Sequence, residues 1–498
     1  MLPRLIQGGM GVGVSAWTLA REVSLLGQLG VVSGTALDTI LIRRLWDGDP
    51  GGHMRRAISA FPSHEIGQAV LARWFRAGGS PASTPAPALG SADDDVTPDD
   101  VGSVGEPAGR RFRPAPLIGA GMNPDRQALI VLANFVEVHL AKEGHDGVVG
   151  VNYLEKIQFP TLPSLYGALL ADVDVVLMGA GIPAEIPDVL HRLAQHLGAS
   201  LGLDVLGAGD RPFRLTFDPR TIGLGSDVPP LRRPSFLPIV SAATLAKALL
   251  RRSPDGIAGF VVEGPVAGGH NAPPRGQLQL NGLGEPVYGV RDDVDLERMK
   301  ALGLPFWLAG AYASPERFEE ALAAGAHGIQ VGTVFAFCEE SGLDPVLRRR
   351  YLERIAQGDG RAFTDPTASP TGFPFKVAAL EGTASEQATY DARPRLCDLG
   401  YLRRAYVRPD GTLGYRCPSE PVDDHVRKGG DIGDTVGRKC LCNALIATIG
   451  LGQVRADGYQ EPPMLTAGDD LEPVRRLISP DRPSYRARDV IEWLLPAG

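Results

Sequence analysis

A glycine-rich stretch near the start of the chain can bring a ligand close to the backbone. Gln7-Gly8-Gly9-Met10-Gly11-Val12-Gly13 follows directly on the apolar run Leu2 to Gln7. Glycines expose backbone amides to a flat ring or an anion, because no Cβ stands in the way. A tight turn between a strand and a helix would use the same residues. The spacing, and the lack of a well-placed acidic residue after a second strand, argue against a dinucleotide-binding fingerprint.

A histidine follows a second pair of glycines, in Ala267-Gly268-Gly269-His270-Asn271. The stretch comes shortly after the apolar run Ala258 to Val262, so it is expected at the end of a strand. An imidazole exchanges protons near neutral pH, and two glycines let a ligand approach it. We predict that His270 is an acid–base group, with a structural or merely solvated histidine as the alternative.

Two later stretches with small residues could hold a phosphate group. Residues 307–314 and 325–333 each combine a short apolar run with glycines. Gly310, Gly332 and Thr333 would offer backbone amides and one hydroxyl. Neither stretch contains Lys or Arg, so the anion would be held by amides and by the start of a helix. Two ordinary turns are the alternative.

The elements that must position these stretches alternate along the chain. Helical patterns such as Pro124 to Lys142 separate short, continuously apolar runs, and Ser15 is predicted to cap a helix over Ala16 to Leu26. Continuous apolar runs are typical of a parallel sheet covered on both faces. The eight candidate strands are Leu2 to Gln7, Gly30 to Ser33, Asp146 to Val151, Val173 to Met178, Phe236 to Val240, Ala258 to Val262, Pro305 to Leu308 and Gly328 to Val331. Eight repeats predict an α/β fold closed into a TIM-type (β/α)8 barrel, with an open doubly wound sheet as the competing arrangement.

Insertions and an appended region interrupt this rhythm. We expect the barrel within residues 1–340 and a mostly helical and irregular region at 341–498. A stretch at 78–113, which includes Asp93-Asp94-Asp95, has too few apolar residues to offset ordering entropy and is predicted to be disordered. Residues 198–234 are expected to hold an extra hairpin. Arg348-Arg349-Arg350 reads as an exposed helix face.

Four of the five cysteines fall close together, at Cys397, Cys417, Cys440 and Cys442. Thiolates suit zinc or an iron–sulfur cluster in a reducing compartment. The spacings fit no standard zinc finger, and small buried cysteines are the simpler interpretation. We therefore predict no metal site and keep these four residues as the candidates if one exists.

The composition excludes several classes of protein. The net charge is -8 over 498 residues, so no basic face for nucleic acid is expected. No apolar run approaches the roughly 18 residues that a membrane helix needs. Five cysteines in a chain of this length argue against a disulfide scaffold. A cytoplasmic protein without nucleic-acid or membrane partners is the expectation.

The ordered set of motifs resembles the nitronate monooxygenase (2-nitropropane dioxygenase) family, which is similar to the flavin-dependent enoyl-acyl carrier protein reductases. The residues behind the resemblance are Gln-Gly-Gly-Met-Gly at 7–11, Gly150-Val151-Asn152, Ala267-Gly268-Gly269-His270, Ala-Gly-Ala at 309–311 and Gln-Val-Gly-Thr at 330–333. The likeness covers roughly residues 1–340. It implies a TIM-type barrel with FMN at the mouth, and oxidation of alkyl nitronates with O2.

The resemblance also implies roles for single residues. Gly8, Gly9 and Met10 would lie by the isoalloxazine ring, and His270 would occupy the position of the family's active-site histidine. Asn152, Gly181 and Ser241 would line the flavin site, and Gly268, Gly269, Gly310, Gln330, Gly332 and Thr333 would surround the ribityl phosphate. The sequence departs from the family at Pro265-Val266-Ala267, where Glu-Ala is usual, so the substrate pocket is expected to differ.

Two other functions fit the same motifs. One is a trans-acting, NAD(P)H-dependent flavin enoyl reductase of a polyketide or fatty-acid system, which would dock an acyl carrier protein. The other is a barrel that binds a phosphorylated ligand without redox chemistry. The primary expectation is a small-molecule substrate with O2 as the acceptor, and a homodimer would be unsurprising.

Overall fold

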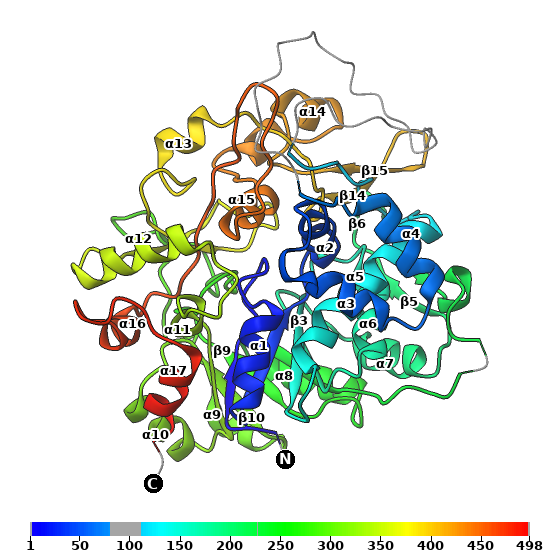
Figure 1. Ribbon diagram of the computed structural model, residues 1–498. Coiled ribbons are helices and arrows are strands. Elements are labelled where there is room, and N and C mark those ends of the chain that lie inside the picture. Colours follow the sequence, from blue (N-terminus) through cyan, green and yellow to red (C-terminus); the bar gives the residue numbers. More distant parts are fainter. Residues whose placement is uncertain (1, 80–110, 227, 497–498) are drawn as a thin grey trace.

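The computed structural model describes residues 2–79, 111–226 and 228–496 (Figure 1). Most of the insertion expected to be disordered at 78–113, including Asp93 to Asp95, lies outside the described residues.

Eight parallel strands close into a barrel. They are β1 (Leu5–Gln7), β2 (Leu29–Ser33), β3 (Val149–Leu154), β4 (Val175–Gly179), β8 (Ser235–Val240), β9 (Phe260–Glu263), β10 (Phe306–Ala309) and β11 (Gly328–Val331). The order around the barrel is β1-β11-β10-β9-β8-β4-β3-β2, and β1 closes the ring by pairing with β11. The predicted (β/α)8 barrel is therefore confirmed, and the open sheet is excluded. All eight expected strands are present; Gly328–Val331 has the predicted bounds, and the ends of the others differ from the prediction by at most three residues.

Helices cover the outside of the barrel. The helix expected at Pro124 to Lys142 is present with those bounds as α5 (Pro124–Lys142), capped by the side chain of Asn123. The remaining helices before residue 341 are α1 (Trp17–Leu25), α2 (Leu37–Trp46), α3 (His53–Ser59), α4 (His64–Trp74), α6 (Thr161–Leu170), α7 (Ile186–Ala194), α8 (Ala243–Arg252), α9 (Leu296–Lys300), α10 (Pro315–Ala323) and α11 (Thr333–Ala336), with 3-10 turns at Pro50–Gly52 and Pro219–Ile222. The expected hairpin is also present, as β5 (Ala199–Gly202) paired antiparallel with β7 (Arg214–Phe217).

The prediction that Ser15 caps the first helix is wrong. The residue at the start of α1 is Ala16, which makes no side-chain cap. The Ser15 hydroxyl instead donates to the Gly8 carbonyl at 3.0 Å and accepts from the Met10 amide at 2.8 Å. These bonds fold the glycine-rich loop back on itself. The sequence around Ser15 gave no sign that its hydroxyl would bind this loop and leave the helix uncapped.

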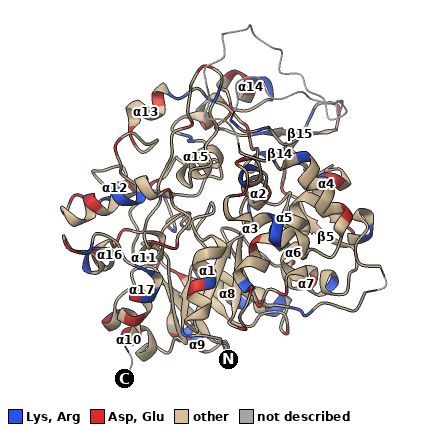
Figure 2. Cartoon of the chain, in the orientation of Figure 1, with Lys and Arg blue, Asp and Glu red and all other residues tan. Residues whose placement is uncertain are grey.

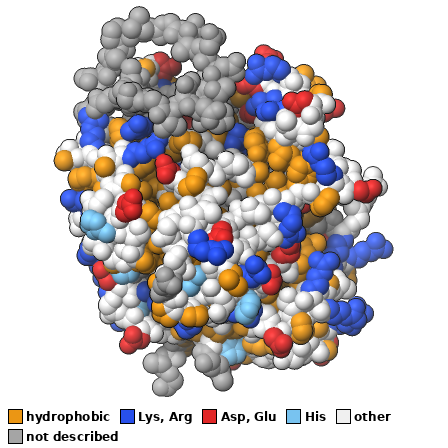
Figure 3. Space-filling model, turned by 90° about the vertical axis from the view of Figure 1, so that its right-hand side faces the viewer, with side chains coloured by type: hydrophobic (Ala, Val, Ile, Leu, Met, Phe, Trp, Pro, Cys, Tyr) orange, Lys and Arg blue, Asp and Glu red, His pale blue; other side chains and the backbone are white. Residues whose placement is uncertain are grey.

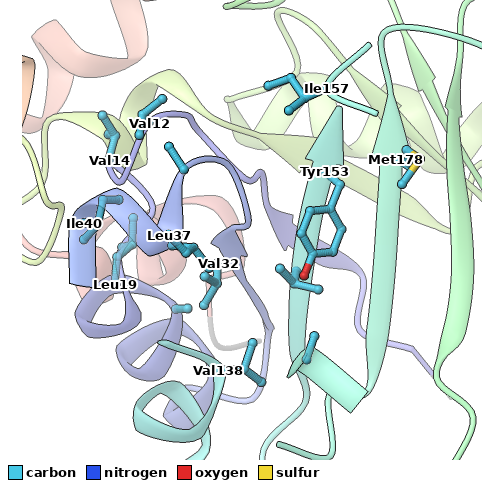
Figure 4. Packing of buried hydrophobic residues seen from close by; sticks show 14 of the residues in the cluster. Val12, Val14, Leu19, Val32, Leu37, Ile40, Val138, Tyr153, Ile157 and Met178 are labelled. Carbon is cyan, nitrogen blue, oxygen red and sulfur yellow. The ribbon is translucent and has the colours of Figure 1, made fainter. Parts of the chain in front are cut away.

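Two apolar cores divide the barrel into an inner and an outer layer. The inner core consists of strand residues that point into the lumen: Ile6, Leu29, Val31, Val175, Leu177, Leu237, Val261, Trp307 and Ala309. The outer core joins the strands to the helices, and Figure 4 shows Val12 and Val14 beside Ile40 of α2. Because side chains alternate along a strand, each residue can be assigned to the lumen or to the helix layer.

The region after residue 340 lies over the carboxyl ends of the barrel strands. It contains α12 (Pro345–Ala356), α13 (Gln387–Ala392), α14 (Val422–Arg427), a 3-10 turn at Ile432–Thr435, α15 (Leu441–Thr448), α16 (Glu472–Leu477) and α17 (Ala487–Leu494). Four short strands form two antiparallel pairs, β12 (Ala362–Asp365) with β13 (Phe375–Ala378) and β14 (Arg404–Val407) with β15 (Leu413–Arg416). A short strand in the connection between β5 and β7, β6 (Val205–Leu206), pairs parallel with β14 and extends the second pair. In Figure 1, α13, α14 and α15 lie at the end of the molecule opposite both chain termini.

The surface mixes charges of both signs. Figure 2 shows basic and acidic residues interspersed on outer helices such as α12 and α16. The face drawn in Figure 3 carries charged groups of both signs, with hydrophobic side chains gathered in its upper half. Within residues 2–79, 111–226 and 228–496, no helix is both long and apolar enough to cross a membrane.

Candidate active site

A cavity of about 250 Å³ opens at the carboxyl ends of the barrel strands. Its walls come from the loops after β1, β2, β3, β4, β9, β10 and β11 and from the region after residue 340. In (β/α)8 barrels this is the end that carries the chemistry. The fold therefore gathers segments that are more than 300 positions apart in the sequence around one space.

Eleven of the thirteen residues predicted for the site line this cavity. They are Gly8, Gly9, Met10, Asn152, Gly268, Gly269, His270, Gly310, Gln330, Gly332 and Thr333. The motifs that the sequence treats separately are thus neighbours in space. Their roles toward a cofactor stay predictions.

Gly181 and Ser241 lie outside the cavity lining. The wall after β4 is formed by Gly179 and Ala180, and a Cβ on Gly181 would lie 1.9 Å from Oε2 of Glu155. The carbonyl of Ser241 accepts a hydrogen bond from Arg275, which lies in the loop that follows β9, at 2.6 Å. The resemblance implied both residues after β4 and β8, but the residues that reach the cavity there are Gly179, Ala180 and Ile239.

Close packing against the lumen requires a glycine at position 9 of the first loop. A Cβ on Gly9 would lie 2.4 Å from the Cβ of Asn152, so no larger residue fits without movement. A Cβ on Gly8 would meet the side chain of Gln330 at 3.4 Å. These contacts hold the first loop against β3 and β11, and they leave its backbone facing the cavity.

His270 is held by a serine from the distant part of the chain. Its Nε2 lies 2.7 Å from Oγ of Ser369, which in turn lies 2.8 Å from Oγ1 of Thr371. The ring also packs edge-on against Phe375, with the ring centroids 4.8 Å apart. Burial lowers the pKa of His270 to about 4, so the imidazole is neutral at pH 7. A neutral ring can accept a proton at the nitrogen that carries none.

Strained backbone surrounds the cavity. Ala36, Ala180 and Ala311 line it with φ angles of 58°, 54° and 56°, a left-handed conformation that disfavours residues with a Cβ. Each follows a barrel strand, after β2, β4 and β10. Such strain persists where the surrounding structure fixes a functional geometry.

The region after residue 340 forms an apolar roof. Leu441, Leu445, Met464 and Leu465 line the cavity from α15 and from the extended segment that follows it. Two hydrogen bonds between backbone amides and threonine hydroxyls hold this segment in place. The Gly269 amide donates to Thr466 Oγ1 at 3.1 Å, and the Gly468 amide donates to Thr333 Oγ1 at 2.9 Å. The roof therefore rests directly on the loops predicted to bind a phosphate.

The lumen end of the cavity holds polar atoms that lack partners. Oδ1 of Asn152 and Oε1 of Gln330 are buried and make no hydrogen bond within the described residues. Unpaired buried acceptors cost about 1–3 kcal/mol each, so native proteins keep few of them. A bound heterocycle with N–H groups would satisfy them, and the open glycine backbone leaves room for it. The residues present therefore fit a flat, hydrogen-bonding cofactor.

The four clustered cysteines meet in the structure. Cys397, Cys417, Cys440 and Cys442 all line one small cavity of about 10 Å³. Burial raises the pKa of each thiol, that of Cys440 to about 12, which keeps them protonated. In the part of the chain that the structure describes, no group of three or more Cys, His, Asp or Glu is arranged to hold a metal ion. Metal analysis of the purified protein tests whether these cysteines bind a metal ion.

Sequence reasoning missed Ser369, Glu263 and the roof. Ser369 is fully buried in an irregular segment and carries no motif of its own. Glu263 stands at the end of β9, where one polar residue after an apolar strand was the available signal. The roof is assembled by contacts across more than 100 positions, for which a single sequence offers no local pattern.

Comparisons with known proteins agree with the motifs. Residues 234–366 match the family model described as nitronate monooxygenase. A probable nitronate monooxygenase of Bacillus subtilis is 34% identical over 115 residues, which is 23% of this chain and 31% of the relative. A nitronate monooxygenase of Paraburkholderia phytofirmans is 26% identical over 181 residues, 36% of this chain and 46% of the relative. The chain thus spans less than half the length of these curated relatives.

Solved structures with similar chains include FabK from Thermotoga maritima, at 14% identity and a TM-score of 0.46, with 99% of this chain and 91% of that chain covered. Nitroalkane oxidase from Streptomyces ansochromogenes has 14% identity and a TM-score of 0.44, with 99% and 94% covered. The barrel itself rests on the strand pairing described above. The sequence matches confirm the resemblance to the nitronate monooxygenase family, whose model matches residues 234–366.

Proposed function

We propose that this protein is an FMN-dependent oxidoreductase with nitronate monooxygenase-type chemistry. The observation that carries the proposal is the position of His270 in the cavity whose walls also include the glycines of the first loop and the loops after β10 and β11. The family match over residues 234–366 supports it, since that segment contains His270 and the stretch 330–333.

The bound flavin would accept an electron from the substrate and pass it to O2, which is chemistry that no side chain supplies. The chain's own residues would bind the cofactor and orient it. Gly8, Gly9 and Met10 would lie by the ring, with Asn152 supporting it. Gly268, Gly269, Gly310, Gln330, Gly332 and Thr333 would surround the phosphate end. The Thr333 hydroxyl accepts from the Gly468 amide and keeps its own proton to donate.

His270 would act on the substrate. The neutral imidazole would take a proton from the carbon beside the nitro group of a neutral nitroalkane, or hold an oxygen of an anionic nitronate. If Ser369 donates to Thr371, then Nε2 of His270 carries the ring proton and donates to Ser369. Nδ1 is then the free base, and it makes no side-chain hydrogen bond among the described residues. The apolar roof would keep bulk water away from this proton transfer.

A second candidate function is an NAD(P)H-dependent enoyl reductase, and the apolar roof favours it. Leu441, Leu445 and Leu465 offer more apolar surface than a small nitronate needs, and an acyl chain would cover it. A Mycobacterium tuberculosis protein described as a carboxyl-CoA dehydrogenase is 27% identical over 145 residues. An acyl carrier protein would be the partner under this function.

Anaerobic stopped-flow reduction separates the functions. The FMN-loaded protein is mixed with an alkyl nitronate, with NADPH, or with buffer, and the flavin absorbance is followed. Bleaching by the nitronate alone supports the monooxygenase, and rapid bleaching by NADPH supports the reductase. A protein that binds no flavin at all contradicts both and leaves a non-redox, phosphate-binding barrel.

A further inference from the structure

Glu263 points into the barrel lumen at the end of β9. Val261 belongs to the inner core, and side chains two positions apart on a strand share a face. Glu263 therefore continues the lumen column of β9 by one layer. It pairs in register with Ala309 of β10, another inner-core residue, and it lines the cavity.

Two amide side chains face the same layer from other strands. Val151 on β3 and Ile329 on β11 belong to the outer core, so their neighbours Asn152 and Gln330 point inward. The carbonyl oxygens of both amides are buried and lack hydrogen bonds, as stated above. The carboxyl group of Glu263 is half-buried at the cavity wall and makes no side-chain hydrogen bond within the described residues. Three strands thus direct unpaired polar groups toward one space.

The surroundings keep the Glu263 carboxyl neutral. The neighbouring strands contribute Ile239 and Ala309 to the cavity, and neither side chain titrates. Burial, with no charged partner in range, raises the pKa of Glu263 to about 8. The other titratable residues of the cavity lining are Tyr153, His270, Tyr312, Tyr401, Cys442 and Asp470. A neutral carboxyl group is a hydrogen-bond donor, whereas the amide oxygens of Asn152 and Gln330 are acceptors.

We propose that Glu263 is a cofactor-binding residue that donates a hydrogen bond from its carboxyl group to a ring carbonyl of the bound flavin. The unpaired amide oxygens of Asn152 and Gln330 would share the single N–H of the oxidised ring as acceptors. Loss of the Glu263 proton would then place a negative charge next to the ring and change its absorption. The inference rests on the proposed function for the identity of the ligand, and it adds a residue that the motifs do not contain.

The test is a pH titration of the bound cofactor's absorption spectrum. Wild type and Glu263→Gln are loaded with FMN and titrated from about pH 5 to 10, with free FMN in parallel to mark the ring's own ionisation. We expect a one-proton spectral transition in the wild type at about pH 8 or above, because a donated hydrogen bond favours the protonated carboxyl. The transition should be absent in Glu263→Gln, whose amide cannot ionise.

A second variant measures binding. Glu263→Leu should bind FMN about 10-fold more weakly by fluorescence titration, since about 1.4 kcal/mol of hydrogen bonding corresponds to a factor of ten. Glu263→Gln keeps a donor and should bind within a few-fold of wild type. Glu155→Gln serves as the control, because Glu155 is also partly buried with a pKa raised by burial but lies outside the cavity lining. Circular dichroism confirms that each variant is folded.

The outcomes separate the two proposals. The role of Glu263 is overturned if the spectral transition of the wild type persists in Glu263→Gln, or if Glu263→Leu binds FMN as tightly as the wild type. Either result leaves the flavin function standing. A wild-type protein that binds no FMN overturns the proposed function and this inference together.

Discussion

Oγ of Ser369 lies 2.7 Å from Nε2 of His270, although the two residues are 99 positions apart in the chain. The region after residue 340 therefore supplies a direct partner to the residue we expect to move protons. A hydrogen bond to one ring nitrogen selects which nitrogen remains free to act. The C-terminal region thus helps to build the site as well as to cover it.

Ser369→Ala should lower turnover and leave the flavin in place. The imidazole loses the partner that orients it, so we expect a decrease of about 10-fold or more in kcat, part of the about 10²- to 10⁴-fold that acid–base groups contribute. FMN affinity should be unchanged, because Ser369 does not line the cavity. Ser369→Thr, which keeps the hydroxyl, is the matched control. Equal kcat in Ser369→Ala and wild type would remove the serine from the mechanism.

His270→Ala should retain FMN and lose most of its turnover with a neutral nitroalkane. The pKa of about 4 means that the wild-type imidazole is already unprotonated at pH 5, so it can act as a base from there upward. The acid limb of the kcat/KM profile should accordingly be flat between about pH 5 and 8. An acid limb near pH 6.5 that disappears in His270→Ala would show instead that the ring titrates at its ordinary pKa.

Much of this architecture could be predicted because the barrel repeats a local pattern. Short apolar runs predicted β1 and β11. The glycines at 8–9 and 268–269 indicated strand ends where the backbone can approach a ligand. Closure of the barrel then brings those ends together. Which residue after a strand reaches the cavity could not be predicted from the sequence, and Gly181 and Ser241 lie just outside the cavity lining.

The roof and the partner of His270 could not be predicted. Ser369 and Met464 lie in extended or irregular segments, where neither helical nor strand periodicity operates. Their positions depend on long-range contacts that a single sequence does not reveal. Glu263 was visible in the sequence, but its lumen-facing orientation follows from the register of β9, which the sequence does not fix.

Glu263→Gln should stabilise the ligand-free protein, and more so at high pH. The pKa of Glu263 is about 8 in the folded chain and about 4.5 when the carboxyl is free in solution. The unfolded chain therefore loses the proton first, so stability from this group is complete below pH 4.5 and declines up to about pH 8. Glutamine has no such decline. We expect the substitution to raise the unfolding free energy by about 1–3 kcal/mol more at pH 8 than at pH 5, where the range allows for water in the cavity.

Urea unfolding of both proteins at the two pH values measures this difference. An equal effect of the substitution at pH 5 and pH 8 would mean that Glu263 ionises normally in the folded state. That result would also remove the neutral donor on which its role toward the cofactor depends.

A buried ion pair between α2 and α5 also accepts a hydrogen bond from a tyrosine of the C-terminal region. Asp38 of α2 pairs with Arg126 of α5, and its Oδ1 accepts from the Tyr401 hydroxyl at 2.6 Å. Asp38→Asn leaves a buried guanidinium without its counter-charge, so we expect a loss of about 3–5 kcal/mol in unfolding free energy. Tyr401→Phe removes one hydrogen bond and should cost about 1 kcal/mol. Similar, small losses in both variants would contradict a structural role for the ion pair.

The visible absorption spectrum of the purified protein, before and after anaerobic addition of alkyl nitronate, shows whether the cavity holds a flavin that the nitronate reduces. We expect FMN absorption bands in a protein loaded with the cofactor, and their bleaching by the nitronate within the turnover time. A protein that shows no flavin bands, even after incubation with excess FMN, would contradict it.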